Sequence, residues 1–342
     1  MQLSRIKNTM NRREAIKQGS IAALALSLPI PLTSFSTYDD MNARKQFEVI
    51  IIGGSYSGLS AAMTLGRSMR DVLIIDSGLP CNRQTPHSHN FITHDGSTPA
   101  EISRKAKSQV LKYDTVHFLE DKAVKAKKAE HSFFIRTESG REFEAKKIVF
   151  ATGVKDIMPK IKGLSECWGI SVVHCPYCHG YEIKNKKTGI IANGETAFHL
   201  APMVKNLTDE LTILTNGIAE FKQEQLSRLN NNNIRQVEKS IAEIEHENGH
   251  IRHVVFSDGS KEHFEATYAA LPFKQHSDIP ELLGCELNEQ GYIQVDMMNK
   301  TTIEGAFACG DNTTRIRSVA NAVASGNMTG AIINMELSNE QF

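Results

Sequence analysis

The fold of this chain is decided by residues 47–58, which read FEVIIIGGSYSG. An apolar run typical of a buried strand leads directly into a glycine-rich turn, and residues 59–67 then have the composition of an Ala-rich helix. A second apolar run, Val72–Ile75, ends at Asp76. An acidic residue about 20 positions after such a turn is the spacing of a βαβ unit that binds a dinucleotide.

Each position of this unit has a physical reason. Gly53 permits the tight turn, and Gly58 allows the helix to approach the strand closely. The free N–H groups of the helix N-terminus favour a pyrophosphate, and Asp76 can accept hydrogen bonds from a ribose. An ordinary βα turn is the alternative, which the strand, helix and terminal acid together disfavour. The candidate cofactor contacts here are Gly53, Gly54, Ser55, Ser57, Gly58 and Asp76.

A second fragment far along the chain completes this unit. Residues 302–311 read as a turn, a short buried strand and Gly310-Asp311 at its end, and a helix with many small residues is expected over 319–337. Residues 151–153, Ala-Thr-Gly, follow another apolar run.

With these motifs, residues 47–337 resemble the flavoprotein disulfide reductases with two dinucleotide folds, and in particular the low-molecular-weight thioredoxin reductases and the gliotoxin-oxidase-like dithiol oxidases. The resemblance implies an α/β fold with two Rossmann-like, three-layer domains, the second inserted in the first. It implies an FAD domain of residues 45–157 and 276–342, and an NAD(P)-binding-like domain of residues 158–275 that rotates in relatives. The flavin contacts that it implies are Ala151, Thr152, Gly153, Gly310, Asp311 and, more weakly, Asn90.

The sequence Cys175-Pro-Tyr-Cys178-His179 carries the chemistry. Two cysteines at this spacing can close a disulfide ring and pass two electrons by thiolate exchange. Glutaredoxins use the same four residues near the start of a small domain, whereas here a long flavin-type segment precedes them. A c-type haem attachment site and a zinc site are further alternatives, although the surrounding flavin motifs favour the redox dithiol.

By resemblance, Cys178 lies against the flavin and Cys175 is the outer thiol that exchanges with the substrate. His179 stands where thioredoxin reductases have an acidic residue. A histidine with a pKa near 6.5 can move the proton that this chemistry requires. His174 is a weaker candidate for the same role, with a surface histidine as the alternative.

The second dinucleotide fold departs from the family. Ala192 takes the place of the first glycine, and Glu195 adds negative charge near the expected pyrophosphate. The strand over residues 211–214 ends in Thr-Asn-Gly, without the basic cluster of NADPH users or the acid of NAD users. Use of NADP or NAD is therefore left open. The polar residues 222–250 predict a solvated helix and loop.

Composition excludes several classes of protein. The 342 residues carry 39 basic and 39 acidic side chains, which argues against a nucleic-acid partner, and 40% hydrophobic residues argue against disorder. No apolar run reaches about 18 residues, so we expect no stable membrane span. His87, His89 and His94 lack further ligands at suitable spacing, so no metal site is expected.

The first 44 residues predict a leader rather than part of the fold. Arg12-Arg13 precede a weakly apolar stretch at 19–32, which resembles a twin-arginine export signal. The expected location is periplasmic if the leader is used and cytoplasmic if translation starts at Met41.

These observations predict an FAD-dependent dithiol–disulfide oxidoreductase that acts on a thioredoxin-like protein or a small dithiol or disulfide, and we also expect a homodimer. One alternative is a dithiol oxidase that uses oxygen rather than NADPH. The other is a non-catalytic flavin-binding protein in which Cys175 and Cys178 form a structural disulfide.

Overall fold

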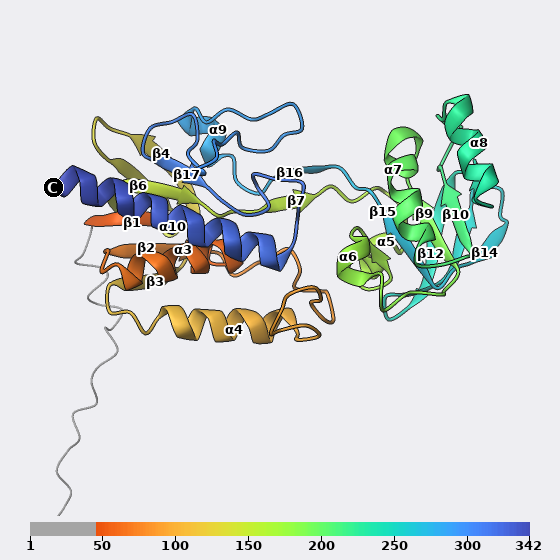
Figure 1. Ribbon diagram of the computed structural model, residues 1–342, viewed down its shortest axis with the longest axis horizontal. Coiled ribbons are helices and arrows are strands. Elements are labelled where there is room, and N and C mark those ends of the chain that lie inside the picture. The colour runs from red at the N-terminus through yellow and green to blue at the C-terminus, as the bar shows by residue number, and fades with distance from the viewer. Residues whose placement is uncertain (1–45) are drawn as a thin grey trace, which may run out of the picture. The chain divides into compact units, whose positions relative to one another are not determined.

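The computed structural model describes residues 46–342, in which two sheets are built largely from parallel strands (Figure 1). The larger sheet has the strand order β3-β2-β1-β6-β5-β4, and β17 also pairs with β6. Its strands are β1 (Gln46–Ile52), β2 (Val72–Asp76), β3 (Val116–Glu120), β4 (Ala123–Lys128), β5 (Phe133–Thr137), β6 (Glu142–Phe150) and β17 (Ala306–Ala308). Strands β1, β2, β3, β6 and β17 run parallel, which is the arrangement of a dinucleotide-binding sheet.

The central strands of this sheet are buried on both faces. Residues Val49–Ile52 of β1 and Val72–Ile75 of β2 are all buried, which explains why their sequence is continuously apolar rather than alternating. The helices around the sheet are α3 (Tyr56–Arg67), α4 (Pro99–Val110), α9 (Ile279–Leu283) and α10 (Val319–Gln341). The predicted α/β class is therefore confirmed.

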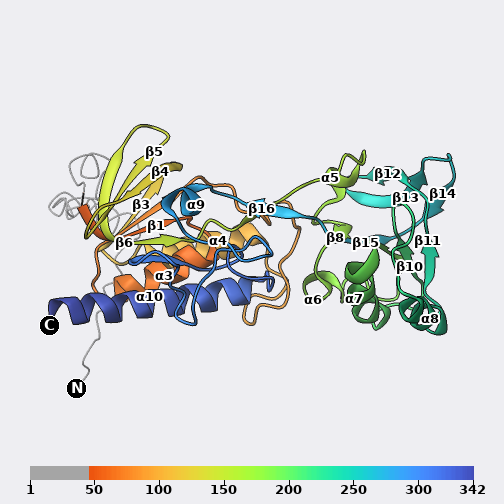
Figure 2. The same ribbon diagram turned by 90° about the horizontal axis from the view of Figure 1, so that it is seen from above.

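Helices α3 and α10 pack against each other at very short range (Figure 1, Figure 2). A Cβ atom at Gly326 of α10 would collide with the carbonyl oxygen of Ser57, and one at Gly330 would lie 2.6 Å from the carbonyl oxygen of Ala61. The hydroxyl of Ser60 also donates to the carbonyl of Val323 at 2.7 Å. The two backbones touch because α10 has no side chain at these positions.

The smaller sheet has the order β11-β10-β9-β15-β8, and every neighbouring pair in it is parallel. It comprises β8 (Val172–Val173), β9 (Thr188–Ile191), β10 (Leu211–Leu214), β11 (Arg235–Val237) and β15 (Ala266–Ala269), with helices α5 (Leu164–Cys167), α6 (Pro176–His179), α7 (Gly194–Lys205) and α8 (Gln223–Asn231). An antiparallel sheet of β12 (Ile241–Glu247), β13 (His250–Phe256) and β14 (Lys261–His263) completes this part.

Two short antiparallel strands connect the larger and smaller sheets. β7 (Val154–Asp156) pairs with β16 (Phe273–Gln275), and the N–H of Ile157 donates to the carbonyl of Pro272 at 2.7 Å. The chain thus leaves the larger sheet after β6 and returns beside its own outgoing path. The predicted boundary between the two domains, at about residues 157 and 276, lies next to strands β7 and β16. This boundary stays a prediction.

The interpretation of residues 222–250 as a solvated helix and loop is wrong in its second half. Helix α8 occupies the first part, but β11, β12 and the start of β13 follow. Ile241 and Ile244 of β12 are buried, whereas the other five residues of this strand are partly or fully exposed. These sparse apolar residues were hidden among the polar residues of the strand.

The contact between α3 and α10 makes a prediction for Gly326. Glycine to alanine normally stabilises a helix by up to about 1 kcal/mol. We expect Gly326→Ala instead to destabilise the protein by about 1–3 kcal/mol, because the new methyl group overpacks the backbone of Ser57. Thermal unfolding followed by circular dichroism measures the change, and Ala324→Leu on the exposed face of α10 is the control. A raised midpoint in Gly326→Ala would contradict the close approach.

Candidate active site

A cavity of about 1480 Å³, here called the main cavity, opens at the carboxyl ends of β1, β2 and β6. This edge of a parallel sheet is where such folds bind ligands, and the volume exceeds the roughly 300–1,000 Å³ of ordinary small-molecule pockets. The predicted residues that line it are Gly53, Gly54, Ser55, Ser57, Asp76, Ala151, Thr152, Gly153, Cys178, His179 and Asp311. The predicted residues that do not line it are Gly58, Asn90, Cys175 and Gly310.

The glycines of the first turn leave backbone where side chains would otherwise stand. Gly53 has a φ of +107°, and a Cβ there would collide with the carbonyl oxygen of Ala151. A Cβ at Gly54 would lie 2.8 Å from the Cβ of Asp76. Gly58 stands directly against the carbonyl oxygen of Gly53, so it sets the packing of α3 on β1 rather than the cavity wall.

Polar groups on this wall suit a nucleotide. The side chain of Ser55 caps none of the N–H groups at the start of α3, so the first turn keeps donors for an anion. Asp76, at the end of β2, accepts from the N–H groups of Gly54 at 2.9 Å and Gly78 at 3.1 Å. These bonds fix its carboxylate, which has further lone pairs available for hydroxyl donors.

Asp311 follows β17 and lies beside an arginine that sequence reasoning missed. Burial raises the pKa of Asp311 to about 6, and Arg317 opposes this effect. The Nε of Arg317 lies 3.7 Å from Oδ2 of Asp311, while its two Nη atoms donate to Asp156 at 2.7 and 3.2 Å. No spacing in the sequence connects these three residues, because 155 positions separate Asp156 from Asp311.

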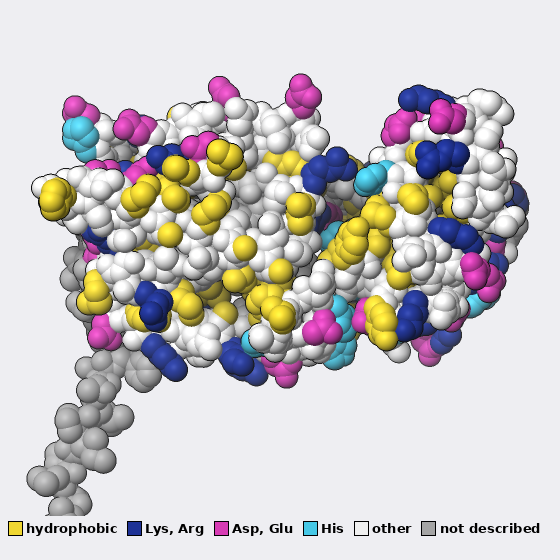
Figure 3. Space-filling model, viewed as in Figure 1, with side chains coloured by type: hydrophobic (Ala, Val, Ile, Leu, Met, Phe, Trp, Pro, Cys, Tyr) yellow, Lys and Arg dark blue, Asp and Glu magenta, His cyan; other side chains and the backbone are white. Residues whose placement is uncertain are grey.

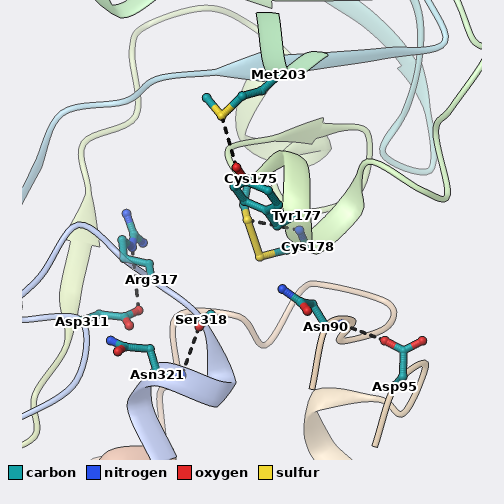
Figure 4. Close-up of a disulfide and its surroundings, with 10 residues drawn as sticks. All are labelled: Asn90, Asp95, Cys175, Tyr177, Cys178, Met203, Asp311, Arg317, Ser318 and Asn321. Atoms are coloured by element: carbon teal, nitrogen blue, oxygen red, sulfur yellow. Dashed lines mark hydrogen bonds and ion pairs between the residues drawn. A yellow bond between two sulfur atoms is a disulfide. The ribbon is translucent and has the colours of Figure 1, made fainter. Parts of the chain in front are cut away.

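Cys175 and Cys178 form a disulfide at the start of α6 (Figure 4). Their Cα atoms are 5.3 Å apart, within the usual range for a disulfide, and the N–H of Cys178 donates to Sγ of Cys175 at 3.1 Å. Cys178 lines the main cavity, whereas Cys175 does not. The exposed ring of Tyr177 lies between them in the chain, and its hydroxyl contacts Sδ of Met203 at 3.7 Å.

Two histidines flank the disulfide, and both line the main cavity. Burial and, to a smaller extent, the charge of His89 together lower the pKa of His179 to about 4. Burial, followed by the charge of Arg317, lowers the pKa of His174 to about 4. Neither histidine therefore has the pKa near 6.5 expected from the sequence. Both are neutral at pH 7 and have a nitrogen lone pair that can accept a proton.

The loop before α4 supplies His89 to the main cavity rather than Asn90. The Nδ1 atom of His89 lies 3.5 Å from Glu182 and 3.7 Å from Asp95. Asn90 has a φ of +58°, and its backbone N–H donates to Asp95 at 2.7 Å, so its visible role is in the loop (Figure 4). Within residues 46–342, no cluster of three or more His, Cys, Asp or Glu side chains could hold a metal ion.

In the second dinucleotide fold, the turn before α7 is bonded to the side chain of Asn193, whereas the side chain of Ser55 caps no N–H group in the first fold. The side-chain oxygen of Asn193, the N-cap of α7, accepts from Gly194 at 2.8 Å and Glu220 at 3.0 Å, and its amide donates to the carbonyl of Ile218 at 2.8 Å. Glu195 in the first turn of α7 pairs with Lys222 at 3.0 Å. The N–H of Gly194 is therefore already bonded, and an acidic residue stands in the first turn of α7, so this turn suits a pyrophosphate less well than the first turn of α3 does.

Comparison with known proteins decides the family. Residues 47–326 match the family described as pyridine nucleotide-disulphide oxidoreductase. The chain belongs to this family. The oxidoreductase is 32% identical over 311 residues to the thioredoxin reductase tcpT of Claviceps purpurea, with 87% of this chain and 96% of the relative covered.

Solved structures agree with this assignment. An oxidoreductase from Agrobacterium tumefaciens is 39% identical with a TM-score of 0.81, covering 86% of this chain and 99% of that one. A putative thioredoxin reductase from Bacillus anthracis is 31% identical with a TM-score of 0.82, covering 86% and 100%. Together with the Cys175–Cys178 disulfide, these findings identify a thioredoxin reductase-like flavin disulfide oxidoreductase.

The family implies FAD, and the main cavity fits this cofactor. The turn at Gly53 and Gly54 leaves space against the backbone, the first turn of α3 supplies N–H donors, and Asp76 and Asp311 supply partly buried acceptors. Cys178 lies in the same wall, as a disulfide that exchanges electrons with FAD requires.

The lowered pKa values predict how stability depends on pH. An unfolded histidine binds a proton near pH 6.5, whereas folded His174 and His179 bind it near pH 4. Between these values the unfolded forms of these two residues hold more protons, so their contribution to stability falls as the pH falls from about 6.5 to 4. We expect His174→Gln to flatten this fall, measured as urea midpoints at pH 7 and pH 5. His131→Gln, at an exposed position, is the control, and an equal flattening in both variants would reject the assignment.

Proposed function

We propose that this oxidoreductase oxidises dithiols, taking two electrons from the substrate through Cys175 and Cys178 and passing them by way of FAD to molecular oxygen. The proposal is carried by the turn of the second dinucleotide fold. There the side chain of Asn193 accepts from the N–H groups of Gly194 and Glu220, and Glu195 puts a negative charge in the first turn of α7, which disfavours the phosphates of NADPH. With this donor disfavoured, the substrate dithiol supplies the electrons.

The disulfide exchange balances within the proposed reaction. A substrate thiolate attacks Sγ of Cys175, the cysteine outside the main cavity, and the disulfide breaks to release Cys178 as a thiolate. The second substrate thiol then attacks the substrate sulfur of this mixed disulfide, which releases Cys175 and an oxidised substrate. Two electrons have moved to the enzyme, and two protons must leave the substrate thiols.

His179 is the residue that we assign to proton movement beside Cys178. Its ring lines the main cavity together with Cys178, which places a neutral imidazole nitrogen where a thiol proton leaves. Its pKa of about 4 makes it a weak base, so it passes this proton on rather than holding it. Bound FAD supplies a two-electron acceptor that molecular oxygen can reoxidise, with hydrogen peroxide as the balanced product. Gly53, Gly54 and Asp76 would hold the nucleotide part of FAD, and Asp311 would accept from its hydroxyl groups.

Anaerobic reduction of the purified protein by different donors tests the direction of electron flow. We expect dithiothreitol to bleach the flavin absorption. On admission of air the absorption should return, with one hydrogen peroxide formed per dithiol oxidised. We expect NADPH and NADH at equal concentration to leave the absorption unchanged. Rapid bleaching by NADPH would reject the oxidase, and a flavin that no dithiol reduces would favour a non-catalytic flavin protein.

Serine variants test the dithiol mechanism. We expect Cys175→Ser to retain bound flavin, because Cys175 does not line the main cavity, but to lose turnover with dithiothreitol by at least about 10³-fold. The matched control is Cys285→Ser, a buried cysteine whose Sγ contacts the hydroxyl of Thr301 at 3.5 Å. Turnover of Cys175→Ser at the rate of the control would show that the disulfide is not used.

A second candidate direction is the reduction of a thioredoxin-like protein with NADPH. The names of relatives favour it, since the matches include the thioredoxin reductase of Claviceps purpurea and the putative one of Bacillus anthracis. Reduction of the flavin by NADPH, followed by reduction of an added thioredoxin, would be the result expected from this candidate.

Assembly and location are further parts of the proposal. Within residues 46–342, none of the helices is long and apolar enough to cross a membrane. We infer a homodimer from the exposed Met328 and Met335 of α10, and Figure 3 shows hydrophobic side chains along that face. Sedimentation of the purified protein checks the dimer. We also propose that residues 1–44, which lie outside the described residues, act as an export signal, and fractionation of cells checks this.

A further inference from the structure

Three charged side chains from separate segments meet in or beside the wall of the main cavity. Asp156 lies on β7, Asp311 follows β17, and Arg317 precedes α10. Their side chains are 10%, 18% and 14% exposed, so solvent screens them poorly. Arg317 and Asp311 line the main cavity, and Figure 4 shows the Arg317 side chain directed towards Asp311.

The guanidinium group of Arg317 is shared unequally between the two carboxylates. The carboxylate of Asp156 accepts a hydrogen bond from each Nη atom of Arg317, at 2.7 and 3.2 Å, which is a bidentate ion pair. Asp311 faces the Nε edge at 3.7 Å, too long for a hydrogen bond. The buried Nε consequently has no hydrogen-bond partner within residues 46–342. A buried donor without a hydrogen-bond partner is destabilising, so stability alone does not explain the position of this atom.

The charges around Asp311 decide whether its carboxyl group is ionised. Burial and the charge of Asp156 disfavour the ionised form, and Arg317 is the cation that opposes them. Cys81 and Tyr292 also face this group, and both have raised pKa values to which Asp311 contributes. With all of these present, the pKa of Asp311 is about 6, so the group is largely ionised at pH 7 and largely protonated at pH 5.

We propose that Arg317 is a positioning residue of the cofactor site: clamped by Asp156, it keeps the Asp311 carboxylate ionised and oriented as the acceptor for hydroxyl groups of the cofactor. An ionised carboxylate is purely an acceptor, whereas a protonated one uses an oxygen as donor and binds hydroxyl donors more weakly. The inference rests on FAD as the occupant of the main cavity, but not on the direction of electron flow.

The test measures the FAD dissociation constant of the purified protein against pH, from the recovery of free flavin fluorescence. The wild-type protein should bind FAD more weakly as the pH falls through about 6, because Asp311 takes up a proton. In Arg317→Gln this transition should move to higher pH by about two units, which lowers the affinity at pH 7 about tenfold. Arg315→Gln, at an exposed arginine two positions earlier, is the matched control.

A variant at Asp156 gives a shift of the opposite sign. Asp156→Asn removes a negative charge beside Asp311 while its amide oxygen can still accept from Arg317 and hold it, so the transition should move to lower pH and binding at pH 5 should improve. Opposite shifts in the two variants support the proposal and keep it testable if Arg317→Gln folds poorly. An unchanged transition in both variants, or a uniform loss of affinity at every pH, would overturn it. Failure of the wild-type protein to bind FAD would instead overturn the cofactor assignment.

Discussion

Helix α3 lies in direct backbone contact with its neighbours on two sides, and the geometry of the main cavity depends on these contacts. Gly58 stands against the carbonyl of Gly53 at the end of β1, and Gly326 of α10 stands against the carbonyl of Ser57. A side chain at either position would push the first turn of α3 away from the strand ends. The N–H groups of that turn, the carboxylate of Asp76 and the start of α10 would then no longer share one wall.

Features encoded by neighbouring residues could be predicted from the sequence. The unit from Phe47 to Asp76 has its strand, turn, helix and acid in one run, and the Cys175–Cys178 spacing defines a disulfide without reference to the rest of the fold. Arg317 was missed because its partner Asp156 lies 161 positions away, on a strand that passes between the two sheets. A lone arginine before a helix has no periodicity that could indicate such a contact.

The lowered pKa values of His174 and His179 escaped prediction for a related reason. Residue type gives the ordinary pKa of a histidine, whereas burial in the wall of a cavity is set by segments that are remote in the sequence. The contact of His89 with Glu182 is another example, since it joins the loop before α4 to the segment after α6. The buried residues of β12 were missed because Ile241 and Ile244 are three positions apart, whereas residues on one face of a regular strand are two apart. The pairing with β13 shifts register between Ile241 and Glu243.

The two cysteines of the disulfide lie in different surroundings, so the place where a substrate would be recognised differs from the place where the cofactor would bind. Cys178 belongs to the wall of the main cavity, whereas Cys175 lies outside that wall. In the reaction that we propose, a thiol partner therefore has to bring a single sulfur atom to Cys175 and does not have to enter the main cavity. The dimensions of the interior then set no upper limit on the partner's size, and discrimination among partners rests on the outer surface around Cys175, where the ring of Tyr177 is exposed.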